Sequence, residues 1–555
     1  MNMQEIHLEN SSSMPVESAH LAWAAALLGV VLLPLRPIIW ALQTLTPIGP
    51  LTRIIKRRLR AWAYLFDGPG IVRREFHKVT SYSTSLPKPA NRDKAHGEPF
   101  EVDAPDVRMV FVSSPRHIKE LDKAPDEVLS LNGAAKHVSA LSLHCFDHGS
   151  YWRQMLQPLY TMNGFNWFDR RGVEGIGFVR TLRTLLTNNI PQLLPDLGLL
   201  TRTRWAESLG NKEAVNGTIH APVYPMMMDL VVLLNARSLF GEDLIKDEKF
   251  MASALGYVEE TLLNAEVVKL LPKPLAPFVG RVLSRCLSSH KTFFRSLIPA
   301  TEQRLEEKRL NSSGHAIPKR ADCIQWIIDT APRQSPWSAE RVIYELMAIW
   351  FGSVHILSTT IVYVIQDLCL HPEYTKLLRQ ELETSYAEFE RTGHGLPLLD
   401  SFIKESSRLT PVESMSVRRC ALKPFSLSDG TKVAPGEWAC APSGAINTSA
   451  EHYPRPDEFS GFRFVDPAEL PGASAPTQPK PSKLTDVDYT FLMWGTGRMA
   501  CPGRYYASAF MKVVVAQLLL NYDFTLVNPE APRWISWRVA RIPRPWTKVA
   551  FTPRT

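Results

Sequence analysis

The sequence predicts a mainly α-helical fold with a minor β-sheet region, arranged as one large domain. Ser338 can cap a helix over residues 339–369, which is apolar in its middle and ends before Pro372. A second apolar helix is expected over residues 505–522. No internal repeat is evident. The segments with strand character are short and clustered: 100–102, 109–112 and 425–433.

The composition is that of an ordinary globular protein. Hydrophobic residues make up 45% and charged residues 21% of 555 residues, which is enough for a large core. The seven cysteines include no Cys-x-x-Cys pair, which argues against a disulfide framework and a structural zinc site and suits a reducing compartment. His144, Cys145 and His148 lack a matching second pair, so we interpret them as loop residues.

The formal net charge of +8 has two interpretations. Nucleic-acid binding needs a clustered basic stripe, whereas the basic residues beyond residue 60 are dispersed. We therefore expect no nucleic-acid partner. The other interpretation is a basic face for an acidic protein partner.

The N-terminal region has the pattern of a membrane anchor. Residues 21–35 are uncharged, apolar sequence resumes after Arg36, and a basic cluster follows. Because the positive charge comes after the apolar run, the pattern predicts an uncleaved anchor whose basic side is cytoplasmic. A helix lying in the membrane surface is the alternative. The predicted organisation is an acidic lumenal tail (1–20), a membrane anchor (21–52), a basic cytoplasmic linker (53–60) and the main domain (61–555).

Cys501 is the first candidate for a chemical role. It lies between two glycines of a turn-rich approach, Gly495 and Gly497, and the pair Pro502-Gly503. Pro502 suits the first position of a helix, which places Cys501 near the N-cap, where backbone N–H groups stabilise a thiolate. Glycines let a flat ligand approach the backbone closely. A thiolate is one of the few protein ligands of haem iron, although a buried thiol at a helix start remains open on this motif alone.

The full string Trp494-Gly-x-Gly-Arg-x-x-Cys501-Pro-Gly resembles the cysteine-ligand loop of the cytochrome P450 family. Two further motifs come before it in the order and spacing of that family. They are Glu405-Ser-Ser-Arg408 and Pro454-Arg-Pro-Asp-Glu-Phe459-Ser-Gly-Phe-Arg463-Phe. The resemblance covers residues 60–555, and the sequence is most similar in character to fungal members of the family.

The resemblance implies a fold and a cofactor. Residues 61–555 would form one P450-like catalytic domain, with haem (iron protoporphyrin IX) between the long central helix and the cysteine loop. Cys501 would be the iron ligand. Glu405, Arg408 and Arg463 would form a buried charge network that holds the loop.

Further residues are assigned to haem binding by the same resemblance. Trp494, Gly497 and Gly503 would lie against the cofactor, and Trp494 replaces the usual phenylalanine. Its indole would shield the thiolate and can donate an N–H. Met499 stands where arginine or histidine is common. The candidates for the propionates are therefore Arg418, with Arg419 as a substitute, Arg498, and either Arg180 or Arg183. A solvated charge is the alternative for each; we favour the propionate role for Arg418 and Arg498, and a solvated helix face for Arg180 and Arg183.

The central helix departs from the family pattern. The family has a segment ending in an acidic residue and a threonine, and here His355 and Ile356 take those positions. The usual hydroxyl is absent, so proton delivery would need Ser353, Ser358, His355, an ordered water or the substrate. The departure predicts a weak proton relay, which favours substrate-assisted oxidation, ring formation or coupling over simple hydroxylation.

The implied function is that of a membrane-anchored haem-thiolate monooxygenase of the endoplasmic reticulum. It would use O₂ and electrons from an NADPH-dependent flavoprotein reductase on a lipophilic small molecule, such as a secondary metabolite. Two rivals are a haem-thiolate isomerase or peroxygenase that needs no reductase, and a non-catalytic haem or lipid binder.

Overall fold

The computed structural model describes residues 50–85, 97–131, 133–134, 177–212, 214–215, 217–271, 275–331, 336–470 and 480–554. The predicted lumenal tail, nearly all of the predicted anchor and the His144, Cys145 and His148 group lie outside these residues.

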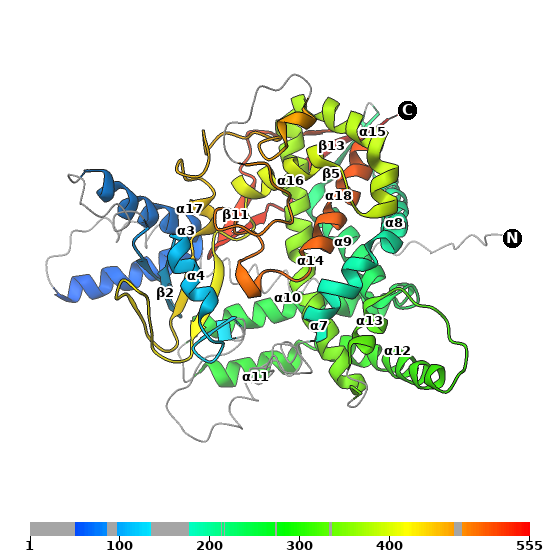
Figure 1. Cartoon of the computed structure of the whole chain (residues 1–555), viewed down its shortest axis with the longest axis horizontal. Coiled ribbons are helices and arrows are strands. Elements are labelled where there is room, and N and C mark those ends of the chain that lie inside the picture. The colour runs from blue at the N-terminus through cyan, green and yellow to red at the C-terminus, as the bar shows by residue number, and fades with distance from the viewer. Residues whose placement is uncertain are drawn as a thin grey trace.

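The described chain is mainly helical, with α14 at its centre and α3 and the strands of the largest sheet on one side (Figure 1). The main helices are α3 (Pro50–Ser85), α4 (Pro115–Lys123), α7 (Gly177–Thr181), α8 (Ile190–Gly210), α9 (Val223–Phe240), α10 (Glu248–Leu270), α11 (Ala276–Cys286), α12 (Ser289–Ser312), α13 (Cys323–Thr330), α14 (Ala339–Leu370), α15 (Thr375–Thr392), α16 (Pro397–Leu409), α17 (Ser443–Ile446) and α18 (Arg504–Asn521). A π-helical turn, η3 (Leu182–Leu186), joins α7 to α8, and short 3₁₀ turns are η4 (Leu244–Lys246), η5 (Pro372–Tyr374), η6 (Pro467–Glu469) and η7 (Gly497–Met499).

The central helix α14 agrees with its prediction to within one residue. The Ser338 hydroxyl caps it by accepting the N–H of Arg341 at 3.3 Å. It packs against α9, α12, α16 and α18. Both α9 and α14 are long and apolar enough to cross a membrane, but most of each helix is buried within the described chain. Their apolarity is therefore that of core helices.

The minor sheet region contains one five-stranded sheet, ordered β1-β2-β9-β6-β3, and one four-stranded sheet, ordered β10-β13-β5-β4. Two hairpins, β7-β8 and β11-β12, complete it. The predicted strands near residues 100, 110 and 425–433 are confirmed as β1, β2 and β7-β8. The strands are β1 (Phe100–Asp103), β2 (Arg108–Phe111), β3 (Leu129–Ser130), β4 (Ala214–Val215), β5 (Thr218–Pro222), β6 (Ser416–Ala421), β7 (Phe425–Ser426), β8 (Lys432–Val433), β9 (Trp438–Ala441), β10 (Tyr522–Leu526), β11 (Trp534–Trp537), β12 (Ala540–Pro543) and β13 (Lys548–Pro553).

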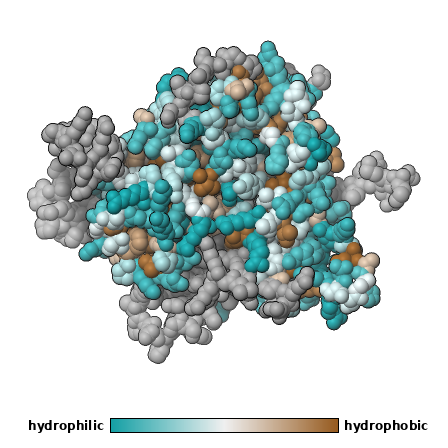
Figure 2. Space-filling view, viewed as in Figure 1, coloured by the Kyte–Doolittle hydropathy of each residue, from teal (hydrophilic) through white to brown (hydrophobic). Residues whose placement is uncertain are grey.

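The largest hydrophobic core surrounds α14 and includes residues of α8, α9, α16 and α18. A second core lies between α3 and the five-stranded sheet. The predicted basic linker, residues 53–60, falls within the first turns of α3, which bends at Asp67 two residues before Pro69. On the face shown in Figure 2, hydrophobic side chains of the described residues are scattered among hydrophilic ones.

Candidate active site

The loop before α18 is shaped by two glycines with left-handed backbone angles. Gly495 has a φ of 70° and Gly497 a φ of 57°. A Cβ on Gly497 would lie 2.8 Å from the Asp122 side chain, so this position has no room for another residue. The turn is closed by the N–H of Cys501, which donates to the carbonyl oxygen of Trp494 at 2.7 Å.

Cys501 lies two residues ahead of the N-cap and not at it. Helix α18 begins at Arg504 with Gly503 as its N-cap, so the prediction that Pro502 starts the helix is wrong by two residues. Burial raises the pKa of the Cys501 thiol, while the Gly503 N–H and the charges of Arg504 and Arg183 act in the opposite direction. A coordinating metal ion removes the proton of such a thiol outright.

A cavity of about 260 Å³ separates α14 from this loop. Ile356 and Thr360 of α14 line one side, and Gly495, Thr496 and Met499 line the other. Ile356 is 46% exposed although its helix is central, because it faces this space. The lining as a whole presents more apolar than polar surface, but its remaining residues are mixed and include Glu413, Arg418 and Arg419; most of them come from the chain between α16 and β6 and from residues just before the loop.

Two adjacent arginines line the cavity at the start of β6. Neighbouring residues of a strand normally face opposite sides, but a register irregularity separates Ser416 from Arg419, and Val417 has a φ of 52°. The distortion accounts for the presence of both Arg418 and Arg419 along one cavity. Arg418 pairs with Glu413, which lines the same cavity.

The remaining arginine candidates, including Arg419 of the cavity wall, already have partners. Arg419 is buried and pairs with Asp122 of α4 at 3.4 Å, and Arg498 donates to Asp126 at 2.9 Å. Arg183 donates to the carbonyl oxygen of Arg498 at 2.9 Å. These contacts direct Arg498 and Arg183 toward the outer side of the loop. The propionate role of Arg418 and Arg498 stays a prediction.

Arg180 donates to the carbonyl oxygen of Thr330, at the end of α13. Gly503 has room for a side chain, since a Cβ there would meet only Leu182 at 3.7 Å. Its contribution is instead its N–H, which hydrogen-bonds Cys501.

The outer side of the loop is hollowed over about 550 Å³. Arg183, Arg498 and Arg504 line this hollow together with one carboxylate, Asp488. Its lining therefore carries more positive than negative charge.

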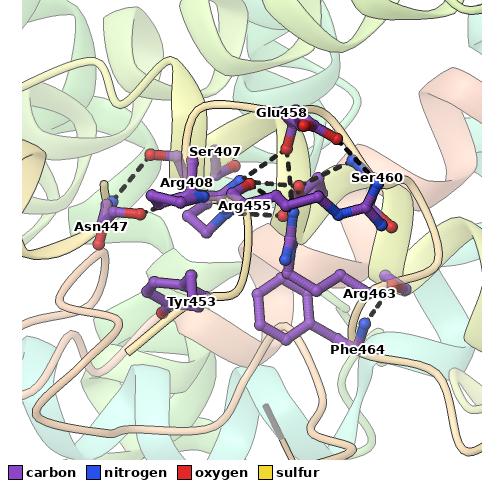
Figure 3. A network of polar contacts seen from close by, with 12 residues as sticks. Ser407, Arg408, Asn447, Tyr453, Arg455, Glu458, Ser460, Arg463 and Phe464 are labelled. Atoms are coloured by element: carbon purple, nitrogen blue, oxygen red, sulfur yellow. Dashed lines mark hydrogen bonds and ion pairs between the residues drawn. The ribbon is translucent and has the colours of Figure 1, made fainter. Parts of the chain in front are cut away.

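Glu405, Arg408 and Arg463 form one charge network (Figure 3). Two N–H groups of Arg408 donate to the two carboxylate oxygens of Glu405 at 2.7 and 2.9 Å, and both side chains are fully buried. Arg463 donates to the same carboxylate at 3.0 Å. The sequence motifs thus place these three residues together as expected.

Backbone carbonyl groups satisfy the remaining donors of the network. Arg408 donates to the carbonyl oxygens of Asn447 and Pro456 at 2.7 and 2.6 Å, and Arg463 donates to that of Pro454 at 2.7 Å. A buried charge with all of its donors satisfied holds its partners in one geometry. The network therefore ties α16 to residues 454–463, which precede the cysteine loop.

The three residues predicted for proton delivery, Ser353, His355 and Ser358, lie away from the cavity. Ser353 accepts a hydrogen bond from Asn235 of α9 at 2.9 Å, and Ser358 donates to the carbonyl oxygen of Val354 at 3.0 Å. His355 is partly buried, and desolvation lowers its pKa to about 4; its Nε2 is shielded from water and has no partner among the described residues. None of the three lines the cavity described above.

Thr360 is the hydroxyl of α14 that does line the cavity. It lies one turn beyond Ile356 on the same stripe of the helix. Sequence reasoning passed over it because the resemblance places the hydroxyl at position 356. Its four-residue spacing from Ile356, which places both side chains on one face of the helix, could have identified it from the sequence.

Trp494 is buried, and its indole N–H donates to the carbonyl oxygen of Leu484 at 2.6 Å. The indole thus donates its N–H, as the sequence allowed, and the acceptor is a backbone carbonyl oxygen. The ring still contributes to the core beside the loop.

A cysteine-bearing glycine loop that lies across a cavity from a central helix, together with a buried Glu–Arg–Arg network, is the arrangement that the resemblance to haem-thiolate proteins predicts. The chain belongs to the cytochrome P450 family, whose model, described as Cytochrome P450, matches residues 204–546, more than half of the chain. It is a cytochrome P450 monooxygenase.

Relatives from filamentous fungi agree with this assignment. The chain is 26% identical to "Cytochrome P450 monooxygenase olcJ" of Penicillium canescens, over 82% of this chain and 81% of that protein. It is 26% identical to "Cytochrome P450 monooxygenase hepE" of Aspergillus oryzae, over 91% of this chain and 84% of that protein. It is 30% identical to "Cytochrome P450 monooxygenase ptmP" of Penicillium ochrochloron, over 54% of this chain and 67% of that protein.

The fold is similar to a solved structure, "Retinoic acid bound cyanobacterial CYP120A1", with a TM-score of 0.55 at 16% identity. The match covers 83% of this chain and 93% of that chain. The predicted fold class, mainly helical with small sheets, is confirmed.

Family membership implies haem, and the residues present fit it. The loop contains one cysteine that could serve as a thiolate ligand, its glycines carry no side chains, and a cavity with more apolar than polar lining surface separates it from α14. Two arginines on the cavity wall can meet carboxylates at its rim.

Proposed function

We propose that this enzyme oxidises a lipophilic small molecule of fungal secondary metabolism. The observation that carries the proposal is the position of the Cys501 loop opposite Ile356 and Thr360 across a largely apolar cavity. Apolar walls bind apolar molecules and keep water out. The relatives support the setting, since the three named above are fungal monooxygenases.

Haem bound here would supply the chemistry of O₂ activation, and the protein would orient the substrate and deliver protons. Cys501 would hold the iron, and Arg418 of the cavity wall would bind a propionate. Ile356 gives the centre of α14 an apolar surface at the position where the family has a hydroxyl. Thr360 adds one hydroxyl to the same wall.

The proposed relay is weak, as the sequence predicted, but its members differ. Ser353, His355 and Ser358 do not line the cavity, and His355 is neutral at pH 7 because desolvation lowers its pKa to about 4. Thr360 is therefore the side-chain hydroxyl proposed to serve the cavity. A weak relay favours substrate-assisted oxidation, ring formation or coupling over simple hydroxylation.

The family implies a redox partner, and we propose an NADPH-dependent flavoprotein reductase. The hollow outside the cysteine loop supports this, because Arg183, Arg498 and Arg504 would attract an acidic donor surface. Because Ile356 replaces the usual hydroxyl, the second candidate is a haem-thiolate isomerase or peroxygenase. Turnover that needs neither NADPH nor reductase would favour the second candidate.

We propose attachment to the endoplasmic reticulum membrane through residues 21–52, with the catalytic domain in the cytoplasm. The uncharged run followed by a basic cluster supports this topology. Helix α11 adds support, since Leu275, Phe278 and Val282 expose 54%, 71% and 45% of their surface in and just before one short helix. Apolar side chains spaced in this way suit a lipid interface.

The proposal is tested with the full chain in membranes. The wild type is expected to give the CO-difference band of a thiolate-ligated haem, and Cys501→Ser is expected to lose that band and all turnover. Metabolite profiling after gene deletion then identifies the accumulated precursor, which is fed to membranes with NADPH and reductase. If the band survives in Cys501→Ser, the ligand assignment is wrong.

A further inference from the structure

Trp494 is held at both its side chain and its main chain. Its indole N–H donates to the carbonyl oxygen of Leu484 at 2.6 Å, and both residues are buried. Its own carbonyl oxygen accepts the N–H of Cys501 at 2.7 Å. One residue therefore connects residue 484 to the backbone of the cysteine.

Leu484 is held in turn by α16. The N–H of Leu484 donates to the Asp400 carboxylate at 2.6 Å. One turn along the same helix, the Lys404 ammonium donates to the Ser482 hydroxyl and to the Lys483 carbonyl oxygen, both at 2.9 Å. Asp400 and Lys404 are 7% and 1% exposed, so these bonds are shielded from water.

Further contacts of Asp400 and Lys404 strengthen the attachment of residues 482–484 to α16. Lys512 of α18 forms an ion pair with Asp400. The Lys404 ammonium also lies 4.6 and 4.8 Å from the ring centres of Phe464 and Phe491. The first contact connects α18 to α16, and the second connects α16 to Phe491, three residues before Trp494.

We propose that Trp494 is a positioning residue for the iron ligand, acting through its hydrogen bond to Leu484. Helix α16 holds residues 482–484, the indole transfers that constraint to residue 494, and residue 494 holds the N–H of Cys501. A phenylalanine at position 494 packs in the same place but has no N–H to donate. This role is separate from the Glu405–Arg408–Arg463 network, which holds residues 454–463.

Loss of the N–H has a defined consequence. The Leu484 carbonyl oxygen would lose its indole donor in a buried site, and the ring would lose its fixed orientation. The Cys501 sulfur would then take up a proton from water more readily, and this exchange converts the thiolate to a neutral thiol. We expect the rate of that exchange in the reduced CO complex to rise about fivefold to tenfold, the factor that one hydrogen bond provides.

The experiment uses haem-loaded full-length Trp494→Phe. The measurements are the rate at which the CO complex passes from the thiolate band to the thiol band, the reduction potential of the iron, and the unfolding midpoint. Trp494→Phe is expected to raise the exchange rate and shift the potential. Trp350→Phe is the matched control, because Trp350 is also buried and its indole donates to a backbone carbonyl oxygen, that of Ala254, at 2.7 Å. It is expected to move only the unfolding midpoint.

A second variant tests the attachment of residues 482–484 to α16 at Lys404. Lys404→Met keeps the apolar stem but removes the ammonium, and it is expected to raise the exchange rate in the same direction. Because both residues act through the segment 482–484, the double variant should exchange no faster than about the faster single variant. Rates that multiply in the double variant, or a Trp494→Phe protein with wild-type rate and potential, overturn the inference.

The inference rests on Cys501 being the iron ligand. Its failure is distinguishable from failure of that assignment. If the wild type lacks the thiolate band, the proposed function fails and the inference falls with it. If Cys501→Ser loses the band and Trp494→Phe matches the wild type, only the inference fails.

Discussion

Thr360 donates its hydroxyl to the carbonyl oxygen of Ile356 at 2.7 Å, and both residues line the cavity opposite the cysteine loop. Within this pair, position 356 contributes an apolar surface and position 360 contributes the hydroxyl. The hydroxyl that the family pattern places at the first position is thus found one turn later. Five predictions follow from this and from the other contacts of the site.

Ile356→Thr is expected to change the coupling of reductant to product, because it adds a hydroxyl to the cavity wall. The product distribution should shift toward simple hydroxylation. The measurement is product and hydrogen peroxide formed per NADPH consumed. An unchanged ratio and unchanged products would show that the missing hydroxyl has no mechanistic effect.

Thr360→Val removes the hydroxyl while keeping the shape of the side chain. If this hydroxyl delivers protons, coupled turnover should fall about 100-fold, the lower end of general acid–base effects. Thr359→Val is the control, since the adjacent Thr359 is buried and is not part of the described cavity wall. Equal losses in both variants would point to helix packing as the cause.

His355 is expected not to titrate during turnover near neutral pH. Burial lowers its pKa to about 4 from an ordinary value of 6.5, so the folded chain binds fewer protons than the unfolded chain between these values. Stability from this residue is complete above pH 6.5 and falls as the pH drops toward 4.

The measurement for His355 compares the wild type with His355→Gln. Their activity profiles between about pH 6 and 8 should coincide, since the folded-state titration lies below that range. The unfolding midpoint should depend less on pH in the variant below pH 6.5. A pH optimum that moves in His355→Gln would restore the histidine to the catalytic set.

Glu405→Gln is expected to lower the stability of the fold strongly. It leaves the fully buried Arg408 without its carboxylate, and breaking a buried ion pair costs about 3–5 kcal/mol. Thermal unfolding and haem content after purification are the measurements. Glu388→Gln removes one member of an exposed pair with Arg391 and should cost less than about 1 kcal/mol. Normal haem retention in Glu405→Gln would contradict the role given to the network.

Glu266 joins α10 to two other elements. Its carboxylate accepts from Arg538, in the turn between β11 and β12, at 2.8 Å, and from Lys269 at 2.7 Å, while Arg538 also pairs with Asp106 at 2.7 Å. Burial alone would raise the pKa of Glu266, but Lys269 and Arg538 outweigh it and lower the pKa to about 2. The stability gained is present above the ordinary value of 4.5 and is lost as the pH falls toward 2.

Glu266→Gln should therefore lower the free energy of unfolding at pH 7 by on the order of 2–3 kcal/mol. Chemical unfolding at pH 7 and at acid pH measures the effect, which should shrink at the lower pH. Glu259→Gln is the control of opposite sign, because burial beside Glu260 and Asp229 raises the pKa of Glu259. Its removal should be neutral or stabilising, and equal destabilisation by both variants would contradict the electrostatic account.

Local signals explain what was predictable from the sequence. The cap of α14 was predictable because the capping bond of Ser338 joins residues three apart. The pairing of β7 with β8 was predictable because the turn residues Asp429 and Gly430 lie between the two strands in the chain. The predicted helix over residues 505–522 agrees with α18 to within one residue, whereas the inference that Pro502 starts the helix was wrong by two residues, since Pro502 is compatible with a helix start but does not require one.

The sequence by itself determined the helical class, the bounds of α14, the cysteine loop and the three motifs that place the chain in its family, because caps, periodicity and motif spacing are written in neighbouring residues. Only the tertiary structure decided which side chains meet. Arg418 pairs with Glu413, Arg419 with Asp122, and Trp494 with Leu484. Such partners depend on how segments pack in three dimensions, and a donor's choice among many acceptors is not encoded by its own position in the chain.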